Sequence, residues 1–133
     1  MTFAQFAAIL SGLQVQGVVK RYAQAPSQLS TAQLPAQWPR LPTGRTEVAT
    51  LDAETKWDVL TCDLLVAVEA ESQGTQPQNW TRSIAIIDAM QTALKAEAAS
   101  ANQIVDSWAL RLAQDQIGDT VYWVIVATVT GSS

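Results

Sequence analysis

The sequence predicts an α+β fold: a mainly antiparallel sheet of two strand hairpins, with two helices packed on one of its faces. Apolar residues recur at helical spacing near the start of the chain and again over 80–99, and at period two over 56–69 and 119–130. The order is helix, irregular stretch, hairpin, helix, hairpin, which is typical of α+β proteins. The 133 residues suffice for a single domain over 1–133 with its own core.

The first helix is predicted over residues 2–14. Thr2 can cap it, and Gln5 three residues later completes a capping box. Four large apolar residues follow one another at spacings of 3, 4 and 3, which places them on one helix face: Phe3, Phe6, Leu10 and Leu13. We expect this face to pack on a sheet.

A long irregular loop is expected over residues 23–44, after a short extended piece at 18–22. The loop contains four of the five prolines. Irregular segments of this length are uncommon inside a compact domain and are often functional. Trp38 stands between Pro35 and Pro39, so a strand here is expected at a sheet edge, because proline cannot donate a backbone hydrogen bond.

The two hairpins account for most of the predicted sheet. In the first, a strand over 45–51 joins the clearest strand, over 56–69, through a turn at 52–55. Period two places Cys62 on the apolar face of that strand, so we interpret it as a small buried hydrophobe rather than a nucleophile. The second hairpin joins 103–113 to 119–130, and the pair Gly118-Asp119 suits its loop.

The second helix is predicted over about 80–99, with Asn79 as its N-cap. Five residues form its expected apolar stripe: Trp80, Ile84, Ile87, Met90 and Leu94. The helix is also rich in alanine. This richness reflects either helix propensity alone or a small-residue face that packs closely on another element.

The composition argues against most catalytic and nucleic-acid-binding functions. The chain has no His, which removes the commonest general base and the commonest metal ligand. Its single Cys excludes an internal disulfide and a Cys-pair zinc site. Eight Lys and Arg against twelve Asp and Glu give a net charge of −4, which disfavours a basic nucleic-acid-binding face. We therefore expect no enzymatic activity, no metal and no cofactor.

The balance of apolar and charged residues indicates a protein that covers part of its surface with partners. Hydrophobic residues make up 48% of the chain and charged residues 15%, against about 25% charged in an average soluble domain. No apolar run reaches the roughly 18 residues of a transmembrane helix. The first residues lack the basic segment of a signal peptide, so we expect a protein made in the cytoplasm.

The element order over nearly the whole chain resembles that of the tail-terminator proteins of long-tailed phages, the family of the lambda minor tail protein U. After a short helix, the proline-containing segment Leu34-Pro35-Ala36-Gln37-Trp38-Pro39 leads into the sheet. A hairpin over Arg45 to Glu69 follows, and then a helix over Asn79 to Ser100. The closing hairpin contains Gly118-Asp119-Thr120-Val121-Tyr122-Trp123 and a valine-rich strand.

The resemblance implies a structural role in the virion. Such proteins form a homo-hexameric ring on the last ring of tail tube protein, stop tube polymerisation and offer a surface to the head-side connector protein. No catalytic residue, cofactor or membrane belongs to this role. The chain would be part of the tail or neck of the virion, assembled in the host cytoplasm. Genome DNA would pass through the lumen without specific binding, and an acidic lumen wall would repel it and let it slide.

The subunit interfaces are expected among the loops and the few cations. A closed ring buries two different patches of each subunit, and we expect contacts from the 23–44 loop, the 52–56 turn and the 70–78 loop. A cation between acidic subunits gains from the neighbour's carboxylates, although a solvated side chain explains each one equally well. The candidates are Arg40, Arg45, Lys56 and Arg82, with Trp57 as an aromatic contact.

Three other functions remain open. The chain could be another neck or tail component, such as a tail-completion, head-closure or tail-tube protein, although tube subunits usually carry one helix rather than two. A small ligand-binding or enzymatic α+β domain would need a pocket with convergent polar groups, for which Asp63 beside Thr61 is the best candidate. An adaptor or antitoxin-like protein that folds against one partner is the third.

Overall fold

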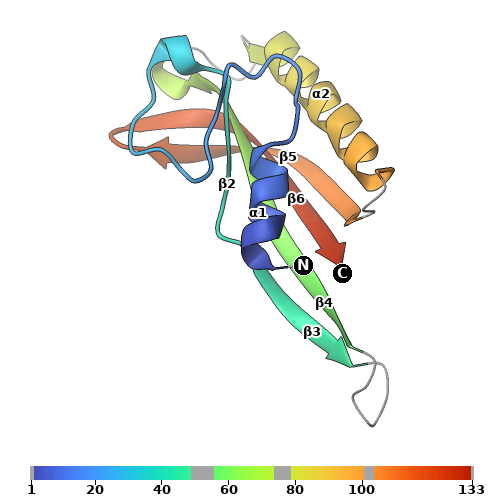
Figure 1. Ribbon diagram of the computed structural model, residues 1–133. Helices are drawn as coiled ribbons and strands as arrows, with labels where there is room; N and C mark the ends of the chain where they lie inside the picture. The colour runs from blue at the N-terminus through green and yellow to red at the C-terminus, as the bar shows by residue number, and fades with distance from the viewer. Residues whose placement is uncertain (1, 49–55, 74–78, 101–103, 133) are drawn as a thin grey trace.

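The computed structural model describes residues 2–48, 56–73, 79–100 and 104–132 (Figure 1). One sheet of six strands has the order β1-β2-β4-β6-β5, and β3 pairs with β4 alongside β2. Every pair of neighbouring strands is antiparallel except β1 with β2. The α+β fold predicted from the sequence is confirmed. The elements are α1 (Phe3–Ser11), β1 (Lys20–Arg21), η1 (Thr31–Gln33), β2 (Ala36–Pro39), β3 (Thr43–Val48), β4 (Lys56–Ala70), η2 (Glu71–Gln73), α2 (Trp80–Ala98), β5 (Val105–Ile117) and β6 (Thr120–Ser132).

Both helices lie on the same face of the sheet, as predicted. The predicted capping box starts α1: the Thr2 hydroxyl accepts from the Gln5 backbone N–H at 3.1 Å, and the Gln5 side chain accepts from the Thr2 N–H at 2.7 Å. Beneath the helices, alternate residues of β4 and β6 meet one face of each helix. The largest side chains of this core are Phe6, Leu10, Leu64, Met90, Leu94 and Ile125.

Helix α1 approaches the sheet closely where a facing sheet position has no side chain. A Cβ atom on Gly131 of β6 would lie 2.9 Å from the ring of Phe6 and 2.7 Å from the carbonyl oxygen of Ile104. A Cβ atom on Gly44 of β3 would lie 3.0 Å from the ring of Phe3. Glycine at position 131 therefore allows α1 to lie close to β6, whereas a Cβ atom on Gly44 would first meet Leu60 and the Val59 carbonyl of β4.

The C-terminal end of α1 is held by side chains from β1 and β2. The fully buried amide of Gln37 donates to the carbonyl oxygens of Leu10 and Leu13 at 3.1 and 3.0 Å. The Arg21 guanidinium donates to the same Leu13 oxygen at 3.1 Å. Because the last carbonyls of a helix have no partner within it, these donors fix where α1 ends on the sheet.

The 23–44 stretch is more ordered than the irregular loop expected from its sequence, since it contains η1, β2 and the start of β3. Its first part, together with the preceding Tyr22, covers the second face of the sheet, where Leu29 and Leu34 contribute to a core that includes Trp38. The hydroxyl of Tyr122 on β6 donates to the Leu29 carbonyl at 3.1 Å. The second face of the sheet is therefore covered in part by the chain itself.

Two expectations about the strands were wrong. Strand β2 was expected at a sheet edge, but Ala36 and Gln37 lie between β1 and β4; Pro39 lies past the end of β1, where its missing N–H costs no ladder bond. Strict alternation was expected throughout β4, but a bulge between Ala67 and Glu69 breaks it. Glu69 consequently reaches Arg82 of α2 instead of sharing the face of Ala67.

The bounds of the other strands differ from prediction by a few residues. Strand β3 begins at Thr43 rather than at residue 45, and β5 runs to Ile117, so the second turn is only Gly118-Asp119, with Gly118 at φ +61°. The turn predicted at 52–55 lies outside the described residues. Of the 70–78 loop, only Ala70 and η2 belong to the described part.

Strand β3 and the start of β4 form an arm that extends beyond the rest of the sheet (Figure 1). The pairing of β6 with β4 begins at Val59, so within the described part residues 56–58 pair with β3 alone. Figure 1 also shows that the β5–β6 hairpin bends along its length. No helix in the described ranges is long and apolar enough to cross a membrane.

Candidate interaction surfaces

The structure divides the predicted interface residues into two groups. Arg40 and Arg82 make ion pairs within the chain, whereas the backbones of Arg45, Lys56 and Trp57 all lie on the β3–β4 arm. The side chains of Lys56 and Trp57 are outside the described part of the structure. Three of the five predicted interface residues therefore lie together on one arm, and the other two lie elsewhere in the fold.

Arg82 is held against the bulge of β4. Its guanidinium lies 2.7 Å from a carboxylate oxygen of Glu69 and donates to the Val68 carbonyl at 3.2 Å. Both acceptors stand at the place where the alternation of β4 is interrupted. Arg82 thus ties the first turn of α2 to the sheet.

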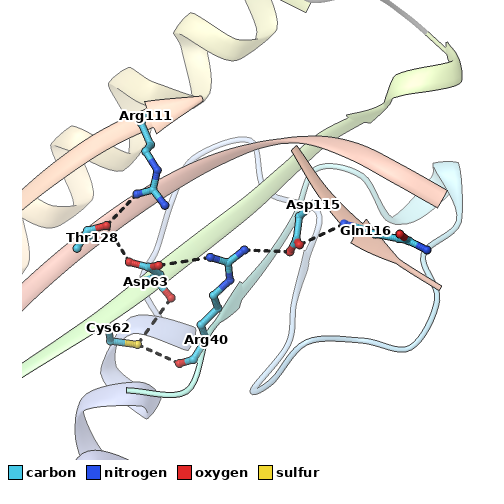
Figure 2. A network of polar contacts seen from close by, with 7 residues as sticks. All are labelled: Arg40, Cys62, Asp63, Arg111, Asp115, Gln116 and Thr128. Carbon is cyan, nitrogen blue, oxygen red and sulfur yellow. Dashed lines mark hydrogen bonds and ion pairs between the residues drawn. The ribbon is translucent and has the colours of Figure 1, made fainter. Parts of the chain in front are cut away.

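Arg40, directly after β2, joins two strands through a polar network on the second face of the sheet (Figure 2). One guanidinium nitrogen lies 3.5 Å from Oδ2 of Asp63 on β4, and another lies 3.4 Å from Oδ2 of Asp115 on β5. Oδ1 of Asp63 accepts from the Thr128 hydroxyl at 2.8 Å, and that hydroxyl accepts from Arg111 at 3.0 Å. Two carboxylates and two guanidinium groups make the network neutral overall.

The network holds the backbone of Arg40 as well as its side chain. The Arg40 N–H donates to the Asp63 carbonyl at 2.8 Å, and the Cys62 thiol lies 3.2 Å from the Arg40 carbonyl oxygen (Figure 2). Asp63 was the best candidate from the sequence for a residue in a ligand pocket, but its carboxylate contacts Arg40 and Thr128. The side chain of Arg40 is nevertheless 43% exposed, so its pairs are reachable from solvent.

Cys62 belongs to the core beneath the helices, as its place in the alternation predicted. Burial, with a further contribution from the Asp63 carboxylate, raises the pKa of the Cys62 thiol from 9.0 to about 11. A thiol that keeps its proton at neutral pH is a poor nucleophile.

The apolar stripe assigned to α2 was partly wrong, and the error uncovers a surface. The core takes Ser83, Ile86, Met90, Ala93 and Leu94. Trp80 and Ile84, both expected inside, are 61% and 40% exposed. The helix carries two overlapping apolar stripes that share Met90 and Leu94, and periodicity alone could not choose between them. Asn79 stands at the N-cap as predicted, but its side chain makes no capping hydrogen bond.

The exposed stripe of α2 forms one wall of an apolar groove, which we call the α2–β5 groove. Its lining is Trp80, Ser83, Ile84, Ile87, Leu112 and Ile125, and it encloses about 120 Å³. The groove runs beside β5, whose outer edge pairs with no strand in the described ranges. Apolar grooves beside an open strand are typical of protein-binding surfaces.

The β3–β4 arm and the α2–β5 groove are two candidate contact surfaces on different sides of β4. The arm lies at the β3 side of β4, and the groove lies over β6 and β5. Within the described ranges, no group of three or more His, Cys, Asp and Glu residues is placed to hold a metal ion. The chain matches no protein-family model and no curated protein sequence.

Proposed function

We propose that this protein is a non-enzymatic structural subunit that assembles into a ring, and that it acts as a tail terminator of a long-tailed phage. The observation that carries the proposal is the separation of two contact surfaces. The β3–β4 arm lies on one side of β4, and the α2–β5 groove lies on the other side, over β6 and β5. A ring of identical subunits needs two such different patches, because each subunit meets its two neighbours through different surfaces.

The order of the elements along the chain supports the proposed role in a phage tail. The order helix, proline-containing segment, hairpin, helix and closing hairpin is the one that resembles the tail terminators, and the observed elements keep it. In this role the ring caps the last ring of tube protein and receives the head-side connector. The net charge of −4 per chain keeps the ring acidic, so genome DNA passes the lumen without being bound.

The arm is the part we assign to the neighbouring subunit or to the tube. Arg45, Lys56 and Trp57 lie on it, and it extends away from the two cores (Figure 1). A cation on such an arm gains most where it meets the carboxylates of an acidic neighbour.

The first experiment measures the absolute mass of the purified chain by light scattering over a wide concentration range, with negative-stain images of the largest species. We expect closed rings near about 86 kDa, which corresponds to six copies of the 14.3 kDa chain. Adding the protein to polymerising tail tube protein should then stop tube growth, with the ring seen at one tube end.

The outcomes separate the remaining functions. A monomer that still binds a tube end and stops its growth would be a terminator that needs its template. A ring that leaves tube growth unchanged would be a different neck component. A monomer that binds no tube would overturn the proposal and favour the ligand-binding or adaptor functions, which thermal-shift screening with metabolites would test next.

A further inference from the structure

Residues 22–35 form a loop between β1 and β2 whose two ends are fastened to each other. The Val19 N–H donates to the Pro35 carbonyl at 2.8 Å. The Tyr22 N–H donates to the Gln37 carbonyl at 2.8 Å, beside the parallel pairing of β1 with β2. A compact loop of this length with adjacent ends is an Ω-loop, a kind of surface unit that frequently has a function. Because its ends are joined through the sheet, such a loop can move without separating any strands.

The loop holds part of its shape through hydrogen bonds of its own. At η1, the side-chain oxygen of Gln33 accepts from the Ser30 N–H at 2.9 Å, and the Gln33 N–H donates to the Ser30 carbonyl at 3.0 Å. The Leu34 N–H donates to the Thr31 carbonyl at 3.3 Å. None of these bonds involves a residue outside the loop, so they can persist when the loop leaves the sheet.

Few contacts attach the loop to the sheet between its fastened ends. No residue from 23 to 33 is buried, and of these Leu29 packs on the core of the second face. Within the described ranges, a single hydrogen bond joins residues 23–33 to anything outside the loop, from the Tyr122 hydroxyl to the Leu29 carbonyl at 3.1 Å. An open hollow of about 510 Å³ lies along residues 22–28 and Gln33. Segments with few buried apolar contacts and an exposed backbone open at a low cost in free energy.

The loop closes against the end of the β5–β6 hairpin. A Cβ atom on Gly118, in the turn of that hairpin, would lie 2.9 Å from the Ser27 carbonyl oxygen, so the loop and the turn lie side by side (Figure 1). Ile117, directly before the turn, is 6% exposed and belongs to the same core as Tyr122. We therefore expect the burial of Ile117 and Tyr122 to depend on the closed position of the loop.

We infer that residues 22–35 are a lid on the core of the second face, and that this lid opens and closes as one unit while the strands stay paired. Its hinges are the two fastened ends, and every strand pair lies outside the moving part. Opening gives solvent access to the Tyr122 hydroxyl and to the apolar side chains around it. Segments that gate a surface are drawn from the least stable parts of a fold. The inference does not rest on the proposed function.

Thiol labelling beneath the lid tests the inference. Ile117→Cys places a thiol where the lid meets the end of β5, and the native Cys62 in the other core is an internal reference. Both thiols are labelled with N-ethylmaleimide at several urea concentrations, mapped by mass spectrometry and corrected for their rates in the unfolded chain. We expect the introduced thiol to react at least about tenfold faster than Cys62, with a smaller urea dependence, because opening the lid exposes less surface than unfolding.

Substitutions in the two cores distinguish opening of the lid from unfolding. In the Ile117→Cys background, Leu29→Ala should speed labelling of both thiols by about tenfold, because the closed state alone loses the contact. Tyr122→Phe should do so by about threefold. Ile86→Ala weakens the other core, which stays intact when the lid opens, so it should speed labelling of Cys62 and leave the introduced thiol unchanged. Leu41→Ala, at a 91% exposed leucine outside the lid, is the matched control and should change neither rate.

Thermolysin cleavage tests the lid in the unmodified chain and does not depend on the folding of a variant. The bond before Leu29 fits the protease only when the Leu29 side chain has left the core. We expect cleavage there at urea concentrations well below the unfolding midpoint. The nicked chain should keep its circular dichroism spectrum, because β1 and β2 hold the two fragments together.

Three results would overturn the inference. In the first, the two thiols react at equal corrected rates with the same urea dependence. In the second, the introduced thiol reacts fast but neither Leu29→Ala nor Tyr122→Phe accelerates it, which would assign its exposure to fraying of the hairpin end. In the third, thermolysin cuts before Leu29 only when the whole chain unfolds.

Discussion

At the scale of single residues, the titration of Cys62 makes the free energy of unfolding depend on pH in the alkaline range. The pKa of its thiol is raised to about 11 in the folded protein, mainly by burial, from an ordinary value of 9.0. Between pH 9 and 11 the unfolded chain loses this proton while the folded chain keeps it, so the free energy of unfolding falls as the pH rises. Below pH 9 the full contribution is present.

We therefore expect Cys62→Ala to change the pH dependence as well as the stability. Near pH 8 the variant should be less stable by about 1–2 kcal/mol, because it loses buried volume. That difference should shrink between pH 9 and 11, since only the wild type has the thiol to titrate. Urea unfolding of both proteins at four or five pH values measures it. If the difference in unfolding free energy between the two proteins stays constant up to pH 11, the pKa of the Cys62 thiol is not raised by folding.

Cys62 and Gln37 show what could be predicted for individual residues. The burial of Cys62 followed from its place in an unbroken alternation, because period two determines the face of a strand. The role of Gln37 could not be predicted, since it lies in a proline-rich stretch and bonds to the carbonyls of Leu10 and Leu13, at and just after the end of α1, which are distant in sequence. A side chain that caps another element leaves no local pattern.

At the scale of elements, the packing of α1 on the sheet depends on glycine. Gly131→Ala places a Cβ atom 2.9 Å from the ring of Phe6 and 2.7 Å from the Ile104 carbonyl, and the carbonyl is backbone that cannot turn aside. We expect a loss of about 1–3 kcal/mol in the free energy of unfolding, the usual cost of overpacking. Urea unfolding measures it.

Gly12→Ala is the matched control for this prediction. Its Cβ would meet nothing nearer than the Ala8 carbonyl at 3.4 Å, and its φ is −90°. Its effect should stay within about 0.5 kcal/mol. Equal stability of the two variants would mean that α1 does not sit as close to β6 as described.

The orientation of α2 is tested by two isoleucines that stand two residues apart. Ile86 is 5% exposed and Ile84 is 40% exposed. Ile86→Ala should cost about 2–4 kcal/mol because it leaves a cavity in the core. Ile84→Ala should cost less than about 1 kcal/mol and act mainly on self-association. Both substitutions change helix propensity equally, so the difference between their unfolding free energies, measured by thermal or urea unfolding, reports packing alone. A larger loss for Ile84→Ala than for Ile86→Ala would mean that the buried face of α2 is the one predicted from the sequence.

The α2 stripe and the bulge of β4 explain where element-level prediction failed. The existence of both helices and the two hairpins followed from strong periodicity. The buried face of α2 did not, because the helix has apolar residues on two faces and only the positions of β5 and β6 select one. The bulge after Ala67 lies in the pairing of β4 with β6, which the sequence of β4 by itself does not show. The candidate surface emerged from the first of these errors, since the stripe left outside lines the groove.

At the scale of the whole molecule, the fold buries much of its apolar composition in two cores. Two cores lie on the two faces of one sheet, and the second is closed by the chain's own 22–34 segment. Among the described residues, the arm and the α2–β5 groove offer surfaces to partners. The sequence predicted that partners cover part of this surface, but their positions depend on the strand order, which no local pattern shows.

The last prediction concerns the charge of the arm. In an acidic ring, reversing a cation that meets a neighbour's carboxylate replaces attraction by repulsion. Arg45→Glu and Lys56→Glu should each raise the dissociation constant of ring assembly by about tenfold or more, which is a cost of about 1.4 kcal/mol or more. The thermal unfolding midpoint should hardly move, because an ion pair at a protein surface typically contributes under about 1 kcal/mol to stability.

Lys20→Glu is the control for charge alone. It makes the same change of charge on β1, which pairs with β2 at the far end of β4 from the arm. Light scattering at matched concentrations compares the three variants, and added salt should weaken wild-type assembly if the arm contacts are electrostatic. If both arm reversals assemble like Lys20→Glu, the arm does not face an acidic neighbour. The groove would then be the main contact between subunits, and the arm would contact the tail tube instead. Weaker tube binding by Arg45→Glu and Lys56→Glu than by Lys20→Glu would place the arm at the tube.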